Sequence, residues 1–155
     1  MNWSAGVSPA YENMPSRWKQ RYVHFNRALD RLNQYVEKET LTELEEPGFI
    51  QTFEVVSELA WKTIKDFYED QGSGILSGAF KIQGSKDAVR LAFRRGLIHD
   101  GKAWFRMIED RNRTSSIYDE GLAKNVMENI RNGYILLFRE LVETLDPAFY
   151  REDGL

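Results

Sequence analysis

The stretch that decides the fold runs from Glu120 to Leu145 and reads EGLAKNVMENIRNGYILLFRELVETL. Its apolar side chains recur every three or four residues, at Leu122, Val126, Ile130, Tyr134, Leu137, Leu141 and Leu145. This spacing places them on one face of an α-helix, which turns once in about 3.6 residues. Asp119 stands where a helix cap is expected, and Asp146 with Pro147 should end the helix.

Two further long helices are predicted upstream. The first, over residues 16–39, carries an apolar stripe of Trp18, Tyr22, Phe25, Leu29, Leu32 and Val36. The second, over residues 47–70, carries a stripe of Phe49, Phe53, Val56, Ala60, Ile64 and Phe67. Stripes of this kind are typical of helices that pack against one another.

Two shorter helices are expected between these long ones. Ser85 is a plausible cap for a helix that ends at Gly96, and Asp100 for a helix from Gly101 to about Arg111. The glycine-rich residues 71–84 are interpreted as a long connection. With no convincing strand, the chain is expected to be all-α: an antiparallel up-and-down bundle of the four-helix-bundle type with extra short helices.

Length and composition are those of a single soluble domain. The chain has 155 residues, 42% of them hydrophobic, and no cysteine, which excludes disulfides and thiolate chemistry. Neither an apolar run of membrane-spanning length nor the pattern of a signal peptide is present, so a cytoplasmic protein is expected. We divide the chain into a loose arm (1–14), one helical domain (15–146) and a tail (147–155).

Charge is distributed unevenly along the chain. The net charge is -3, but residues 90–113 hold seven basic and three acidic side chains, or +4, which leaves -7 for the remainder. Such a patch can attract phosphate or an acidic partner. The alternative is a set of solvated helix faces.

The polar residues 110–120 hold the candidate site. Arg111, Arg113 and, one helical stretch earlier, Arg106 can bind phosphate oxygens, and the Tyr118 hydroxyl is a potential acceptor in a transfer reaction. The structural alternative is that Arg111 interacts favourably with a helix C-terminus while Tyr118 packs beside the next helix start.

Several kinds of chemistry have no sequence support. The glycines of residues 72–84 are not followed by Lys-Ser or Lys-Thr, so no P-loop is present. His24 and His99 are too few and too far apart to suggest a metal site, and no Asp-x-Asp pair exists for magnesium. We therefore expect no metal and no cofactor, and the chain should not activate a nucleotide by itself.

Several segments resemble one known family. They are residues 17–21 (RWKQR), 50–54 (IQTFE), 58–66 (ELAWKTIKD), 92–98 (AFRRGLI) and 104–118. Together they are similar to the nucleotidyltransferase substrate-binding branch of the HEPN superfamily, whose motif is Arg, four residues, His, one residue, Tyr. Arg111 and Tyr118 fit that spacing, whereas Ser116 stands at the histidine position.

The resemblance implies a homodimer with the Arg111 regions of two chains at a shared cleft. It also implies a partner, a minimal nucleotidyltransferase encoded nearby. Two roles are attached to such proteins: a non-catalytic substrate-binding subunit, with Tyr118 as candidate AMP acceptor, and a metal-independent ribonuclease toxin of a toxin–antitoxin pair.

The residue at position 116 separates these two roles. A metal-free ribonuclease acting through Arg111, position 116 and Tyr118 needs a group that moves protons near neutral pH, for which histidine is suited and Ser116 is not. We therefore place the ribonuclease second, with RNA as its ligand. A third interpretation is a scaffold with no link to nucleotides. The sequence leaves open the final substrate and the stoichiometry with the partner.

Overall fold

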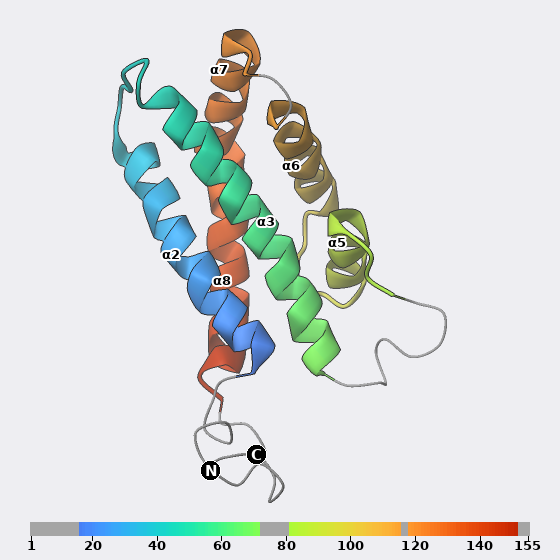
Figure 1. The fold of residues 1–155 in the computed structure, drawn as a ribbon. Coiled ribbons are helices and arrows are strands. Elements are labelled where there is room, and N and C mark those ends of the chain that lie inside the picture. The colour runs from blue at the N-terminus through green and yellow to red at the C-terminus, as the bar shows by residue number, and fades with distance from the viewer. Residues whose placement is uncertain (1–15, 72–80, 116–117, 152–155) are drawn as a thin grey trace, which may run out of the picture.

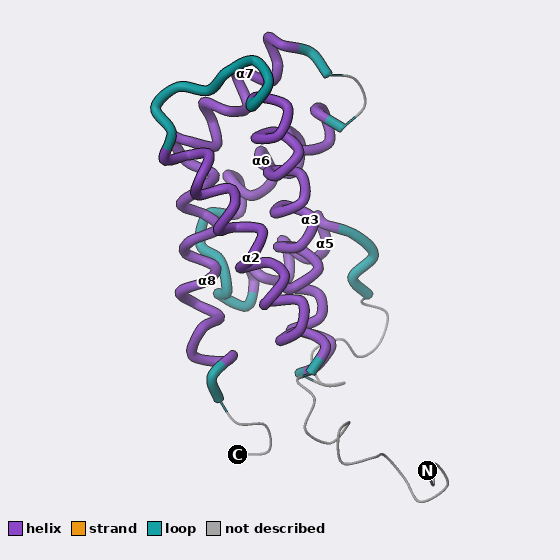
Figure 2. Tube along the Cα trace, turned by 60° about the vertical axis from the view of Figure 1, so that its left-hand side comes forward, coloured by secondary structure: helices purple, strands orange, loops and turns teal. Residues whose placement is uncertain are grey.

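The structure, a computed structural model, describes residues 16–71, 81–115 and 118–151, and most of these residues lie in helices (Figures 1 and 2). No strand occurs in these ranges, and the prediction of an all-α bundle is confirmed. The elements are α2 (Arg17–Glu37), α3 (Glu46–Asp70), α5 (Ser85–Arg94), α6 (Gly101–Thr114), α7 (Glu120–Asn129), η2 (Ile130–Tyr134) and α8 (Ile135–Phe149).

Helix α3 lies at the centre of the packing. It runs alongside α2 over much of its length and also contacts α5, α6 and α7 (Figure 1). Five residues of its apolar stripe, Phe49, Phe53, Val56, Ala60 and Ile64, are inaccessible to solvent, and the sixth, Phe67, is partly buried. Burying large side chains of this kind stabilises the fold by roughly 1.5–3 kcal/mol each, so α3 is the element on which the other helices depend.

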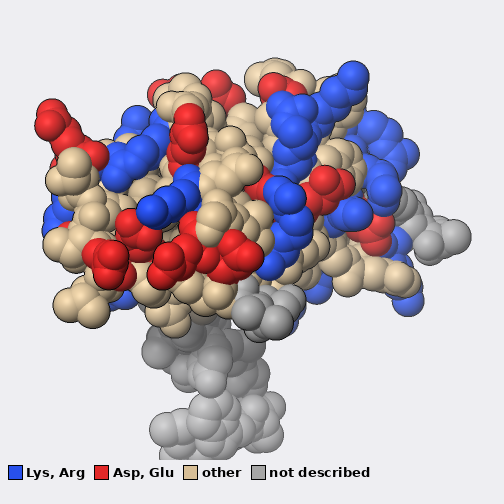
Figure 3. Space-filling view, turned by 90° about the horizontal axis from the view of Figure 1, so that it is seen from above, with Lys and Arg blue, Asp and Glu red and all other residues tan. Residues whose placement is uncertain are grey.

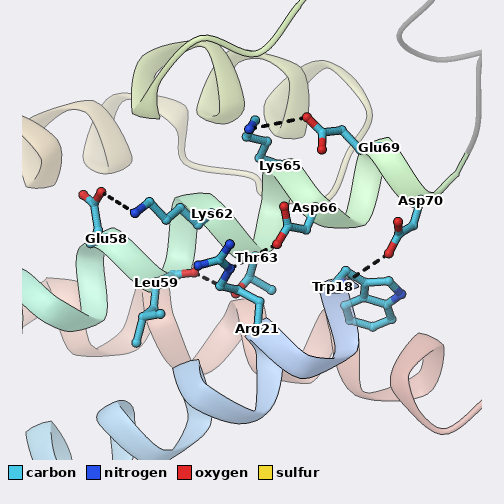
Figure 4. Close-up of polar contacts among 10 residues, drawn as sticks. All are labelled: Trp18, Arg21, Glu58, Leu59, Lys62, Thr63, Lys65, Asp66, Glu69 and Asp70. Atoms are coloured by element: carbon cyan, nitrogen blue, oxygen red, sulfur yellow. Dashed lines mark hydrogen bonds and ion pairs between the residues drawn. The ribbon is translucent and has the colours of Figure 1, made fainter. Parts of the chain in front are cut away.

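Polar contacts fix the register of α2 against α3. The Arg21 side chain donates from Nε to the buried Asp66 carboxylate at 3.0 Å, and the Trp18 backbone N–H donates to Asp70 at 3.1 Å (Figure 4). The Asp66 pair is the more important of the two, because a buried carboxylate left without its partner is strongly destabilising.

The last helix continues through Pro147 to Phe149, so the prediction that Asp146 and Pro147 end it is wrong. The final turn is held from α2: the Tyr22 hydroxyl donates to the Asp146 carboxylate, and the Tyr22 and Phe149 rings lie 5.1 Å apart. Proline removes one backbone donor, a loss that these contacts outweigh at a helix end.

The short helix α5 (Ser85–Arg94) begins one residue earlier than expected. Gly84 is the capping residue and Ser85 the first helical residue, so the prediction of Ser85 as cap is wrong. The Asp87 carboxylate instead accepts a hydrogen bond from the Gln83 N–H at 3.1 Å. After α5 the chain turns at Gly96, whose φ of 78° favours glycine.

A wider turn interrupts the long C-terminal helix. Residues Ile130–Tyr134 form the π-helical segment η2 between α7 and α8. Such segments are rare and are often found at functional sites. Here η2 positions the Tyr134 hydroxyl 2.6 Å from the Asp110 carboxylate of α6.

None of the helices in the described ranges combines the length and the apolar character needed to cross a bilayer.

Candidate functional site

The candidate arginines lie on a helix. Helix α6 begins at the predicted cap, where Asp100 accepts a hydrogen bond from the Ala103 N–H at 3.0 Å, but it runs to Thr114. The expected end near Arg111 is therefore wrong by one turn. The last turn persists because the Thr114 and Ser115 hydroxyls donate to the carbonyls of Arg111 and Asn112, at 3.0 and 2.9 Å, and such terminal carbonyls otherwise lack partners.

Because Arg111 and Arg113 are two residues apart on a helix, they point to different sides, about 200° apart. Arg106 and Arg113 are seven residues apart and share a side. The structure thus separates the three predicted phosphate ligands: Arg106 and Arg113 line one pocket, and Arg111 lines another.

Arg111 faces α3. Its guanidinium lies 3.6 Å from the Glu58 carboxylate, and its Nε is buried without a hydrogen-bond partner among the described residues. Glu58 also accepts a hydrogen bond from the Trp61 indole N–H at 3.0 Å. The Lys62 ammonium group lies 3.2 Å from the same carboxylate (Figure 4). Burial raises the pKa of the Glu58 carboxyl, but these donors, with Arg111, bring the pKa below its usual value.

A groove of about 400 Å³ lies beside Arg111, lined also by Gln51, Glu54, Val55, Glu58 and Leu59. The Thr114 hydroxyl lies 3.2 Å from the Glu54 carboxylate on the same side of α6. Two carboxylates therefore border the Arg111 guanidinium, and one of them already pairs with it. A phosphate group could reach Arg111 only by displacing or sharing the Glu58 contact.

Asp110 organises the opposite side of α6. Its buried carboxylate accepts hydrogen bonds from the Tyr134 hydroxyl at 2.6 Å, from the Asn129 amide at 3.1 Å and from Arg113. Burial and the Asp110 hydrogen bond raise the pKa of Tyr134 well above its usual value, although the charges of Arg106 and Arg113 oppose the shift. The pocket here has a volume of about 550 Å³.

Tyr118 lies just before α7. Its side chain is 44% exposed. Burial and then the charges of Glu46 and Glu120 raise the pKa of its phenol. The predicted Asp119 cap is confirmed, since its carboxylate accepts from the Leu122 N–H at 2.9 Å. Ser116 lies outside the described residues.

The basic side chains of residues 90–113 do not form one site. Figure 3 shows basic side chains gathered over the side of α5 and α6, with a group of acidic ones across the molecule. Arg90, Arg94 and Lys102 line a separate hollow between α5 and α6. The patch therefore comprises three surfaces with different neighbours.

The helical bundle and its arginine-bearing helix place the chain in a class of all-α proteins that a family model describes. The model of the family described as nucleotidyltransferase substrate binding protein like matches residues 20–147, and the chain belongs to this family.

Two relatives extend this finding. "Probable ribonuclease HepT" from Haemophilus influenzae is 39% identical over 83 residues, which are 54% of this chain and 56% of that protein; the match thus spans little more than half of the relative's length. The crystal structure of ttk003001694 from Thermus thermophilus aligns with a TM-score of 0.67 and 25% identity, over 82% of this chain and 99% of that chain.

Sequence reasoning missed the residues that hold the arginines in place. The spacing of Arg106, Asp110 and Arg113 over two helical turns was a usable signal, because it puts them on one side of a helix. Nothing local linked Glu58 to Arg111 or Tyr134 to Asp110, since those contacts join different helices.

Proposed function

We propose that this chain is the non-catalytic, substrate-binding subunit of a two-component nucleotidyltransferase, and that Tyr118 accepts AMP. The observation that carries the proposal is the position of Tyr118, an exposed phenol on the short connection that leaves the Arg111-bearing helix. Family membership supports a nucleotidyltransferase as the partner.

The transfer would join the Tyr118 oxygen to the α-phosphorus of ATP. The bond from that phosphorus to the β-phosphate oxygen breaks, pyrophosphate leaves, and the phenol proton passes to a base. A phenol of ordinary pKa, about 10, is already neutral at pH 7, and burial shifts the pKa of Tyr118 further in that direction. The partner enzyme would therefore supply the base, together with the magnesium that orients ATP.

The test is the intact mass of the chain after incubation with the neighbouring nucleotidyltransferase, magnesium and ATP. Wild type should gain AMP and Tyr118→Phe should not. Tyr150→Phe is a matched control, because Tyr150 is 77% exposed and lies at the far end of the last helix. Equal AMP on wild type and Tyr118→Phe would refute the acceptor role.

A ribonuclease is the second candidate, favoured by the name of the Haemophilus influenzae relative. It would act through Arg111 and Tyr118, with Ser116 replacing the motif histidine. Expression without the partner should then arrest growth, and Arg111→Ala should relieve the arrest. Arrest that appears only in Ser116→His would identify a ribonuclease site that this substitution restores.

We further propose that two copies pair through the sides that carry Arg111. The exposed Val55 and the half-buried Leu59 beside Arg111 support this pairing, because burying apolar surface against a second copy would remove it from water. Size-exclusion chromatography with light scattering should give the mass of a dimer for wild type and of a monomer for Val55→Glu. A monomer that also fails to bind the nucleotidyltransferase would favour the scaffold interpretation.

A further inference from the structure

A hollow of about 500 Å³ lies between α5 and the start of α6, away from Arg111 and Tyr118. Its lining combines two aromatic rings with basic side chains: Arg90, Phe93, Arg94, His99, Asp100, Gly101, Lys102 and Phe105. The volume is in the range that holds a small ligand.

Phe93 offers a ring to this hollow. The side chain is 53% exposed, although phenylalanine is usually buried. Gly101 packs closely against this ring, because a Cβ added at Gly101 would lie 3.3 Å from the Phe93 ring atoms. The ring is thus held against the start of α6 while about half of it faces solvent, an arrangement suited to stacking.

Charge determines what can stack there. Three basic side chains and one acidic side chain, Asp100, line the hollow, so its net charge is +2 with His99 neutral. Arg90 lies 5.5 Å from the centre of the Phe105 ring and pairs at 3.4 Å with Asp87. The Asp100 carboxylate is already used as the cap of α6. The hollow therefore favours a planar ring joined to negative charge.

We propose that this hollow binds a free nucleotide, with the base on Phe93 and the phosphates near Lys102, Arg94 and Arg90. Aromatic rings and basic side chains together are the usual means of holding a base and its phosphate. A free nucleotide fits better than a long RNA, because the chain outside residues 90–113 carries -7 and would repel a polyanion.

This inference deepens the proposed function and rests on it for its biological meaning, since a subunit serving a nucleotidyltransferase would present a nucleotide. Its test uses the full chain alone. The two proposals can therefore fail separately. A chain that does not bind nucleotide would refute the hollow but not the transfer of AMP to Tyr118, and a failed transfer would not refute nucleotide binding in the hollow.

The experiment is calorimetric titration with ATP, adenosine, tripolyphosphate and a short 5′-phosphorylated oligoadenylate. ATP should bind more tightly than either adenosine or tripolyphosphate. Phe93→Leu should weaken the binding of ATP at least about fivefold, the lower end of what base stacking contributes. It should leave the affinity for tripolyphosphate unchanged. Lys102→Gln should weaken the binding of ATP and of tripolyphosphate alike. Lys124→Gln makes the same charge change outside the hollow and should alter neither affinity.

Gly101→Ala provides a second route to the stacking contribution, because the added Cβ presses on the Phe93 ring without removing it. It should also weaken ATP selectively. Unchanged circular dichroism spectra would establish that both variants fold. Equal affinity for ATP and tripolyphosphate in wild type, with no effect of Phe93→Leu, would overturn the proposal. Tighter binding of the oligoadenylate through Phe93 would overturn the assignment of a free nucleotide.

Discussion

The hydrogen bond between Tyr134 and Asp110 should be a main support of the candidate site. It joins α6, which carries Arg106 and Arg113, to the π-helical turn, and its 2.6 Å length is typical of a hydroxyl that donates to a carboxylate. A hydrogen bond to a charged group contributes about 1.5–3 kcal/mol. We therefore expect Tyr134→Phe to lower the free energy of unfolding by about 2 kcal/mol.

Asp110→Ala should cost more. It removes the same bond and the Asn129 contact at 3.1 Å, and it leaves a buried Tyr134 hydroxyl without its acceptor. Arg113 adds little, because its side chain is 59% exposed and such pairs contribute about 0–1 kcal/mol. The expected loss is about 3–4 kcal/mol, or a fall in melting temperature of roughly 10 °C for a chain of this size.

The assay is urea unfolding followed by circular dichroism for wild type, both single variants and the double variant. The double variant should be about as stable as Asp110→Ala, which gives a coupling energy of about 1.5–2 kcal/mol between the two side chains. Arg113→Gln is the control and should change stability by less than about 1 kcal/mol. Additive losses in the double variant would refute the reasoning.

Three other predictions follow from single contacts. Glu58→Gln should raise the affinity of the chain for phosphate in calorimetry, because it removes the negative charge beside Arg111; the same gain in Glu128→Gln would make it a general charge effect. Asp119→Ala should cost about 1 kcal/mol and speed amide exchange in the first turn of α7, whereas Asp119→Asn, which can still cap, should not. Burial raises the pKa of Tyr68 to about 12, against the opposing charge of Arg95. A raised folded-state pKa gives stability that is complete below the unfolded value near 10 and is lost as pH rises toward 12. Stability should fall less steeply in that window for Tyr68→Phe, and an identical slope would contradict the assignment.

The long helices could be predicted because their signals are local. The stripe from Phe49 to Phe67 and the stripe from Leu122 to Leu145 repeat at the helical period, and Asp100 and Asp119 are caps read from neighbouring residues. These are features that a few adjacent positions determine.

The misses have tertiary causes. The last helix passes Pro147 because Tyr22, more than a hundred residues away, holds Asp146. The π-helical turn at Ile130–Tyr134 left the apolar spacing helical, so periodicity could not reveal it. At the site, Glu58 and Asp110 decide which arginine is paired and which pocket each one lines, and both effects depend on how α3, α6 and η2 pack.

The most direct test of the central claim is to locate the AMP on the chain after reaction with the nucleotidyltransferase. Trypsin cleavage after Arg113 and Lys124 releases residues 114–124, in which Tyr118 is the only tyrosine beside the hydroxyls of Thr114, Ser115 and Ser116. Fragmentation of this peptide should place AMP on Tyr118. AMP on one of the neighbouring hydroxyls, or on another peptide, would contradict Tyr118 as the acceptor.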